Sequence, residues 1–330
     1  MKEFLDPALL FFVFGIAAGA VRSNLEIPPP IARFLSLYLL MALGLKGGFA
    51  LAQSGLTPEV AVTLSSAVAL AVVVPALGYL VLRRVLNGFD AAAVSATYGS
   101  VSAVTFITAV QFLDTHQIPY GGHMAAAMAL MESPAIIMAV LLANSVRNRQ
   151  TAPGPGAPHG SLPAPSTMPL RRVMHEALTD GSQLLLLGAM VVGILSADAG
   201  QAAMKPFTGD LFKGMLAFFL LDMGLLAARN MGQLRGTSTW LLAYAVVGPL
   251  VHATMALLLA RATGMSPGNG ALLMVLAASA SYIAVPAVVR HAIPEAKPSL
   301  YFGLSLGLTF PLNILAGIPL YVSTARWALG

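Results

Sequence analysis

Ten stretches of mainly apolar residues follow one another along the chain, separated by short intervals that are polar or rich in proline and glycine. A transmembrane helix needs about 20 apolar residues, and most of these stretches reach that length. They predict membrane-spanning helices at residues 7–22, 29–52, 58–82, 91–113, 121–146, 174–197, 208–228, 238–261, 267–289 and 298–324. The pattern indicates an all-α integral membrane protein with ten transmembrane helices.

The fifth and sixth predicted helices are separated by a stretch rich in proline and glycine, which can neither continue a helix nor form a packed core. We expect a flexible linker there, with five helices on each side. The predicted organisation is a first five-helix repeat at residues 1–147, a linker at 148–170 and a second five-helix repeat at 171–330.

Small residues recur at similar places in the two halves. The matching positions are Gly44 with Gly224, Ser100 with Ser279, Ser102 with Ser281 and Pro134 with Pro311, at offsets between 177 and 180 residues. Several matches in the same order favour an internal repeat over chance. Because five is an odd number of spans, the second repeat is expected to enter the membrane from the opposite side, which is an inverted-topology repeat.

The composition agrees with a membrane protein. Hydrophobic residues make up 57% of the chain, charged residues make up 9%, and the mean hydropathy is +0.80, whereas soluble domains carry roughly 25% charged residues. The absence of cysteine excludes disulfides and Cys-ligated metals. The first apolar stretch resembles a cleavable signal peptide, but Glu3 and Asp6 replace the expected positive leading region and favour a retained helix.

Lysine and arginine are distributed unequally between alternate loops. One set of loops holds 12 of these residues and the other holds five, while Lys46 lies inside a predicted span. The positive-inside rule places the richer set in the cytoplasm. We therefore expect both termini outside and the linker in the cytoplasm of a plasma membrane, the inner membrane of a bacterium. The net charge of +5 reflects these loop positions and does not indicate a nucleic-acid partner.

The fourth and ninth predicted helices carry glycine and hydroxyl residues where apolar residues are expected. These are Gly99, Ser100, Ser102 and Thr105 in the fourth, and Ser279, Ser281 and Tyr282, followed by Pro286, in the ninth. They predict two broken helices that cross near the middle of the membrane, because exposed backbone is tolerated there only around a cavity. Pro286 is expected to free the backbone carbonyl of Tyr282.

Two half-helix N-termini that face one cavity form an anion site without a cationic side chain. Freed carbonyls and hydroxyls can hold a small cation beside the anion. The alternative is that these small residues only allow close helix packing, which is their commonest role when each is taken singly. Their symmetric placement in the two halves favours the binding site.

Ionisable residues inside membrane spans are candidates for function by default. For Glu132 and Asp222, a structural hydrogen bond and a role in cation coordination or proton relay are about equally good explanations. Snorkelling to the interface explains Lys46 better than substrate contact does. Packing explains His252 better than a ligand role.

The motifs of several other functional classes are missing from the sequence. There is no HExxH, P-loop, nucleophile elbow or Cys/His cluster, so an intramembrane protease or a nucleotide-driven pump would lack its working residues. The sequence predicts a transporter that is not an enzyme and needs no cofactor, driven by an ion gradient or by the gradient of its substrate. A sensor or scaffold would not need paired broken helices.

Several segments resemble the SbtA-type sodium-dependent bicarbonate transporters. They are residues 42–48, 99–105, 131–134, 223–224, 248–252 and 277–290. The resemblance implies a core domain and a gate domain, a homotrimer, and bicarbonate held with sodium between the fourth and ninth helices. It implies a PII-like regulatory partner only loosely, because the linker is short and uncharged in its middle.

Two short runs carry the family's binding residues onto this sequence. The family's Ser-Gly-Ser-Thr run is similar to Ser102-Ala103-Val104-Thr105, and its Ser-Ser-Ser-Asp run is similar to Ser279-Ala280-Ser281-Tyr282. A phenol cannot replace the charge of the family's aspartate near neutral pH. Either Glu132, Ser102 and Ser281 hold the sodium ion with backbone oxygens, or sodium coupling is weakened or lost. Tyr282 could instead donate a hydrogen bond to an anion.

The sequence therefore predicts a symporter that takes up bicarbonate with sodium by alternating access. The candidate substrate-binding residues are Gly99, Ser100, Ser102, Ala103, Thr105, Ser279, Ser281 and Tyr282. The alternatives on the same scaffold are a transporter of another small carboxylate anion and a cation/proton antiporter that uses Glu132 and Asp222. The expected partners are the anion, sodium and membrane lipid.

Overall fold

A computed structural model describes residues 6–150, 175 and 179–330, and every regular element in this part of the chain is helical. The predicted linker at 148–170 lies almost wholly outside the described residues. Seven described helical stretches are long and apolar enough to cross a bilayer, and two shorter apolar helices accompany them. The chain is therefore an all-α integral membrane protein, as its hydrophobic pattern predicts.

The first half of the chain forms six helices, two of which are consecutive pieces of one predicted span. They are α1 (Pro7–Ala20), α2 (Pro29–Ser54), α3 (Pro58–Leu82), α4 (Gly88–Gly99), α5 (Ala103–Thr115) and α6 (Met124–Gln150). A proline begins each of the first three, because its fixed φ suits the first helical turn and its missing amide hydrogen is not needed there. Local sequence thus determines where these helices start.

The second half of the described chain is also helical, with more irregular turns. Its elements are α8 (Gly181–Lys205), the π-helix η2 (Pro206–Asp210), α9 (Leu211–Met231), the 3₁₀-helix η3 (Gly232–Leu234), α10 (Thr239–Thr263), α11 (Pro267–Ala278), α12 (Ala284–Ala292), α13 (Pro298–Leu304), the π-helix η4 (Ser305–Thr309), α14 (Phe310–Leu312), the π-helix η5 (Asn313–Gly317) and α15 (Ile318–Leu329). Ala197, with φ of 44°, marks a kink inside α8.

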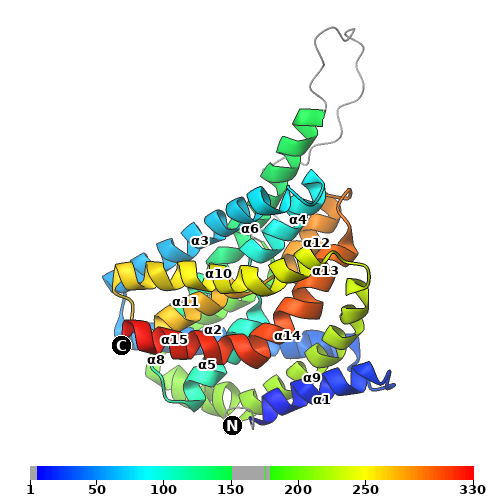
Figure 1. The fold of residues 1–330 in the computed structure, drawn as a ribbon. Helices are drawn as coiled ribbons and strands as arrows, with labels where there is room; N and C mark the ends of the chain where they lie inside the picture. Colours follow the sequence, from blue (N-terminus) through cyan, green and yellow to red (C-terminus); the bar gives the residue numbers. More distant parts are fainter. Residues whose placement is uncertain (1–5, 151–174, 176–178) are drawn as a thin grey trace.

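Glycines bring two pairs of helices into close backbone contact. A side-chain carbon added to Gly224 of α9 would lie 3.0 Å from the Cα of Gly15 in α1, and one added to Gly193 of α8 would lie 3.0 Å from the Cα of Gly48 in α2. Small residues allow this approach, which maximises van der Waals contact where no hydrophobic driving force between helices exists. Figure 1 shows α1 lying beside α9.

The other helices pack around the two interrupted spans. α3 packs against α4 and α6, and α10 and α15 pack against α11. Figure 1 shows α3 and α10 crossing one face of the molecule, with α11 and α15 close to α10. The interrupted spans are therefore enclosed, and α4 is buried at ten of its twelve positions.

One buried arginine joins the end of α6 to the segment after α12. Arg147 donates two hydrogen bonds to the carboxylate of Glu295, at 2.9 and 2.8 Å, and another to the carbonyl of Ala292 at 2.9 Å. The bonds from Arg147 hold the pKa of Glu295 below its usual value. The pair therefore stabilises the fold at pH values above the unfolded pKa of glutamate.

We expect this contribution to be lost on acidification. Because the pKa of Glu295 is lowered on folding, the stabilisation is full above the unfolded value of about 4.3 and falls as the pH drops through the folded value. Since the Glu295 side chain is 36% exposed, the effect is expected to be below about 1 kcal/mol. Thermal unfolding in detergent at pH 7 and pH 3 tests this. The destabilisation caused by Arg147→Met should be larger at pH 7, and equal destabilisation at both values would contradict it.

Candidate functional site

The fourth predicted span breaks between Gly99, the last residue of α4, and Ala103, the first residue of α5. Ser102 caps α5, because its hydroxyl oxygen accepts a hydrogen bond from the backbone amide of Thr105 at 3.2 Å and another from the Thr105 hydroxyl at 2.9 Å. Such caps satisfy one of the amides that a helix N-terminus leaves without an intrahelical partner. Ser102 and Thr105, two of the residues from which the break is predicted, thus stabilise it.

The ninth predicted span breaks between Ala278, which ends α11, and Ala284, which begins α12. The Ser281 hydroxyl accepts a hydrogen bond from the amide of Val285 at 3.3 Å. Pro286 lies in the first turn of α12, where an amide has no intrahelical acceptor. The position of Pro286 in the sequence suggested that it would free the backbone carbonyl of Tyr282. This prediction is wrong, because α12 begins at Ala284, after Tyr282.

The two breaks touch each other. The backbone amide of Ser102 donates to the Ser279 hydroxyl at 3.0 Å, and the backbone amide of Ser281 donates to the carbonyl of Thr97 at 2.8 Å. The Ser279 hydroxyl in turn donates to the carbonyl of Leu276 at 2.8 Å. All of these polar groups are buried, so the bonds fix the register in which the two interrupted spans cross.

A side chain from the last span completes the second break. The Asn313 amide nitrogen donates to the carbonyl of Ala278 at 2.8 Å, and its oxygen accepts from the Tyr321 hydroxyl at 3.0 Å. The carbonyls at a helix C-terminus lack intrahelical donors, and a buried carbonyl without a partner is costly. Asn313 therefore stabilises the open end of α11.

A cavity of about 180 Å³ lies beside the crossing, and we call it the central cavity. Its lining includes the predicted residues Ser102, Ala103, Glu132, Ser281 and Tyr282. The N-termini of α5 and α12 both reach it, since Ala103 and Ala284 are among its lining residues. The positive ends of two half-helix dipoles therefore meet at one small cavity, where they favour negative charge.

The other predicted substrate-binding residues lie behind this lining. Thr105 and Ser279 hold Ser102 in place through the bonds given above. Gly99 packs against the ring of Pro75, where an added side-chain carbon would lie 2.5 Å from ring atoms. The Ser100 hydroxyl is buried and has no hydrogen-bond partner. The structure therefore places these four residues at the crossing but not in the lining of the central cavity.

The candidate sodium ligand Glu132 faces the central cavity from α6. Its carboxylate accepts a hydrogen bond of 2.9 Å from the side-chain amide of Gln183, at the start of α8. Ser102 and Ser281 line the same cavity. The described residues contain no cluster of three or more His, Asp or Glu side chains of the kind that holds a metal ion. Any cation here would depend on hydroxyl and backbone oxygens together with Glu132.

Tyr282 is buried between the two breaks and α9. Its hydroxyl donates to the sulfur of Met223 at 3.6 Å, and its ring meets Phe310 edge to face with centroids 5.1 Å apart. The side chain lines the central cavity but directs its hydroxyl towards α9. It therefore forms an aromatic wall of the central cavity.

A larger space of about 1220 Å³, which we call the vestibule, adjoins the central cavity. The two share Ser36, Asp180, Ser182, Tyr282 and Ile283. The vestibule is also lined by Arg33, Arg290 and Asp222. Solutes can therefore approach the central cavity from the side of the molecule where α8 begins and α12 ends.

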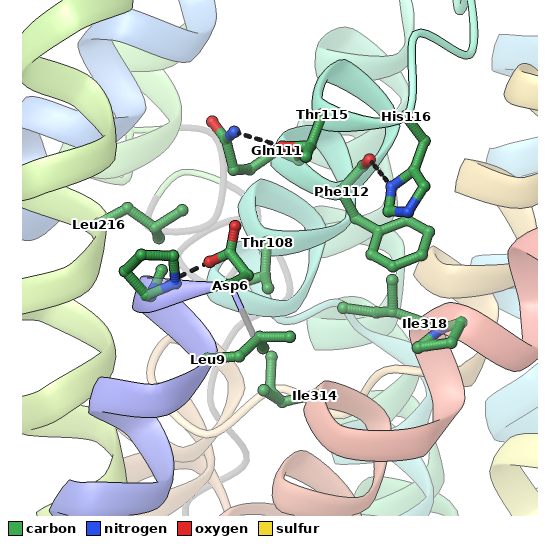
Figure 2. Close-up of a pocket in the computed structure, with 13 residues that line it drawn as sticks. Asp6, Leu9, Thr108, Gln111, Phe112, Thr115, His116, Leu216, Ile314 and Ile318 are labelled. Atoms are coloured by element: carbon green, nitrogen blue, oxygen red, sulfur yellow. Dashed lines mark hydrogen bonds between the residues drawn. The ribbon is translucent and has the colours of Figure 1, made fainter. Parts of the chain in front are cut away.

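Another pocket, of about 410 Å³, lies apart from the helix breaks. Figure 2 shows Asp6, Gln111, Thr115 and His116 around it, with Leu9, Leu216, Ile314 and Ile318 as its apolar wall. Gln111 donates to the Thr115 hydroxyl at 3.0 Å within α5. His252, buried in α10, lines neither this pocket nor the central cavity.

Sequence reasoning missed several lining residues of the central cavity. Asp180 accepts from the amides of Ser182 and Gln183 and thereby caps α8, while Ser36 comes from α2. The available signal was the polar group Asp180, Ser182 and Gln183 inside the predicted span 174–197. The contact of these residues with the two breaks depends on how distant segments pack.

Comparison with known proteins identifies a family. Residues 7–326 match the family model described as the Na⁺-dependent bicarbonate transporter superfamily. No curated protein matches the chain. The match covers almost the whole chain, including both interrupted spans.

Proposed function

Because the chain belongs to the Na⁺-dependent bicarbonate transporter superfamily, we propose that it takes up bicarbonate by secondary active transport coupled to sodium. As a member of a transporter family it is not an enzyme, as its motifs predict. The observation that carries the proposal is the meeting of the α5 and α12 N-termini at the central cavity. Backbone amides and helix dipoles stabilise an anion there without a cationic side chain.

The proposed architecture has ten spans in two inverted repeats. The stretch Gly181–Leu234 has 54 residues, about 80 Å of helix and more than twice the thickness of bilayer hydrocarbon, so we count it as two spans. The glycine contacts support the repeat. Gly15 meets the backbone of Leu221, Gly224 and Leu225 as Gly193 meets that of Leu45, Gly48 and Phe49. In this comparison Gly224 of the second repeat corresponds to Gly48 of the first repeat. Gly48 lies one helical turn after Gly44, the residue that the sequence pattern matches with Gly224.

We propose that transport proceeds by alternating access between a gate domain (α1, α2, α8 and α9) and a core domain formed by the remaining helices. The vestibule opens on the side of Arg33 and Arg290, which belong to the arginine-rich loops expected in the cytoplasm. The described conformation is then inward-facing. Glu132 on the core and Gln183 on the gate are joined across the central cavity. The homotrimer and the PII-like regulator stay predictions.

Uptake of radiolabelled bicarbonate into proteoliposomes tests the proposal. We expect accumulation with an inward sodium gradient and at least a tenfold lower rate without sodium, because the coupling cation would be missing from the hydroxyls and the Glu132 carboxylate at the central cavity. Uptake that is indifferent to sodium would remove the coupling, and no uptake would remove bicarbonate as the substrate. Ser95→Ala is a suitable control for substitutions of the serines that line the central cavity. Ser95 is buried in α4, but among the contacts described its hydroxyl bonds only its own helix.

A cation/proton antiporter is the second candidate, favoured by the placement of the Glu132 carboxylate in the central cavity. The two functions respond differently to Glu132→Gln. Antiport requires a titrating carboxyl group and would be abolished. Anion transport depends on the two helix N-termini, so it would persist with altered sodium dependence.

A further inference from the structure

Three cavities follow one face of α2. Ser36 and Leu40 line the central cavity. Leu43, Gly47 and Ala50 line a small chamber of about 140 Å³, and Ala50 also lines an outer basin of about 560 Å³. The spacing of three and four residues places all five positions on one side of the helix. A continuous stripe of α2 therefore runs from the central cavity to the opposite side of the protein from the vestibule.

A cluster of charged and aromatic groups lies where the small chamber meets the outer basin. The Lys46 ammonium of α2 is 3.1 Å from the Asp114 carboxylate of α5, and the Tyr120 hydroxyl donates to the same carboxylate at 2.9 Å. The ammonium also lies 4.6 Å from the ring centre of Phe212 in α9. Burial and the neighbouring Asp114 raise the pKa of Tyr120, so its hydroxyl stays protonated as a donor.

The same cluster connects parts of the chain assigned to different domains. Lys46 and Phe212 belong to the gate helices α2 and α9, whereas Asp114 belongs to the core helix α5. Close backbone packing accompanies these contacts, since a side-chain carbon added to Gly47 would lie 2.9 Å from the carbonyl oxygen of Gly122. Movement of the core against the gate must separate these groups.

The small chamber is closed on its inner side as well. Leu43 and Phe106, which line it, are 3% and 1% exposed, and Met128, which lines the central cavity, is 4% exposed. The small chamber and the central cavity share no lining residue among those described. Packed apolar side chains thus separate the small chamber from the central cavity along this face of α2.

We propose that the outer half of the transport route runs along this face of α2 and that Lys46, Asp114 and Tyr120 form a latch that closes its outer end in the inward-facing state. This inference rests on the transport function proposed above. The ion pair is partly exposed, at 26% and 33% of its side chains, and such pairs are weak. A weak latch suits a contact that must break and re-form in every cycle.

The chain has no cysteine, so a single Leu43→Cys substitution in the small chamber reports on access from the outer basin. The probe is a membrane-impermeant methanethiosulfonate with a trimethylammonium group, added on the Asp114 side of sealed vesicles. We expect slow labelling in the otherwise unchanged protein. Lys46→Ala and Asp114→Ala should each raise the labelling rate about fivefold, the upper end of what a partly exposed ion pair contributes.

Lys46→Ala removes a positive charge and Asp114→Ala removes a negative charge. An electrostatic effect on the cationic probe would therefore change the two labelling rates in opposite directions, whereas opening of the latch raises both. Rates that rise in both variants, and that fall again in the Lys46→Asp, Asp114→Lys double variant, support the latch. Unchanged rates, or rates that move in opposite directions, would overturn it. Lys205→Ala is the matched control, because Lys205 lines the outer basin outside the Lys46–Asp114 contact.

Tyr120→Phe provides a second variant that removes one hydroxyl and retains the ring, so a loss of folding in the charge variants does not leave the question open. We expect a smaller rise of about twofold, and no change would count against the role of Tyr120. Labelling does not require transport. Failure of the latch alone appears as normal bicarbonate uptake with unchanged labelling, whereas failure of the proposed function appears as absent uptake whatever the labelling.

Discussion

Replacing Ser102 with aspartate is expected to lower bicarbonate uptake about a thousandfold, while asparagine at the same position retains most of the activity. Both side chains can cap α5 as the serine does, because each offers an oxygen to the amide of Thr105. They have the same size and differ in charge. A carboxylate about 4 Å from a bound anion costs about 4 kcal/mol at the effective dielectric of such a site, and each 1.4 kcal/mol is a factor of ten.

Initial uptake rates in proteoliposomes and the unfolding temperature in detergent should be measured for both variants. The unfolding temperatures are expected to agree closely, which would show that the helix cap survives. If aspartate and asparagine reduce uptake equally, then size and not charge limits the site. In that case the central cavity does not bind an anion beside Ser102.

The largest expected effect on stability comes from Gly224→Ala. The added carbon would meet the backbone of α1 at Phe12 and lie 2.9 Å from the amide nitrogen of Ile16, and neither group is the end of a flexible side chain. We expect α1 and α9 to separate, with a loss of about 1–3 kcal/mol, the usual cost of overpacking.

Gly214→Ala is the matched control because Gly214 lies in the same helix, and an added carbon there meets nothing within 4 Å. Alanine favours helix over glycine by about 1 kcal/mol, so this variant should be neutral or slightly more stable. Unfolding in detergent, followed by circular dichroism, compares the two. Equal unfolding temperatures would show that the glycine contact between α1 and α9 does not limit stability.

Much of the helical framework could be predicted because bilayer hydrocarbon imposes long apolar stretches. The interrupted spans were also predictable, since residues such as Ser102 and Ser281 offer hydrogen bonds that compete with helix continuation. The resemblance to sodium-dependent bicarbonate transporters, which several segments of the sequence carry, is confirmed by the family match. Sequence alone thus determined most local features of the crossing.

The remaining features depend on packing between distant segments. Nothing near Gln183 in the sequence indicates that it bonds Glu132, and nothing near Asn313 indicates that it holds the carbonyl of Ala278. Nothing near Lys46 in the sequence indicates that it pairs with Asp114. The kink at Ala197 has no glycine or proline at that position to announce it.

The difference in size between the vestibule and the adjoining central cavity has a consequence for inhibitor binding. The vestibule, at about 1220 Å³, is large enough for a drug-sized molecule, whose pockets usually measure about 300–1000 Å³. The central cavity, at about 180 Å³, is not. A compound with an anionic end that reaches towards the two helix N-termini would lodge there without being carried across. Such a blocker would act from one face of the membrane only and would trap one conformation.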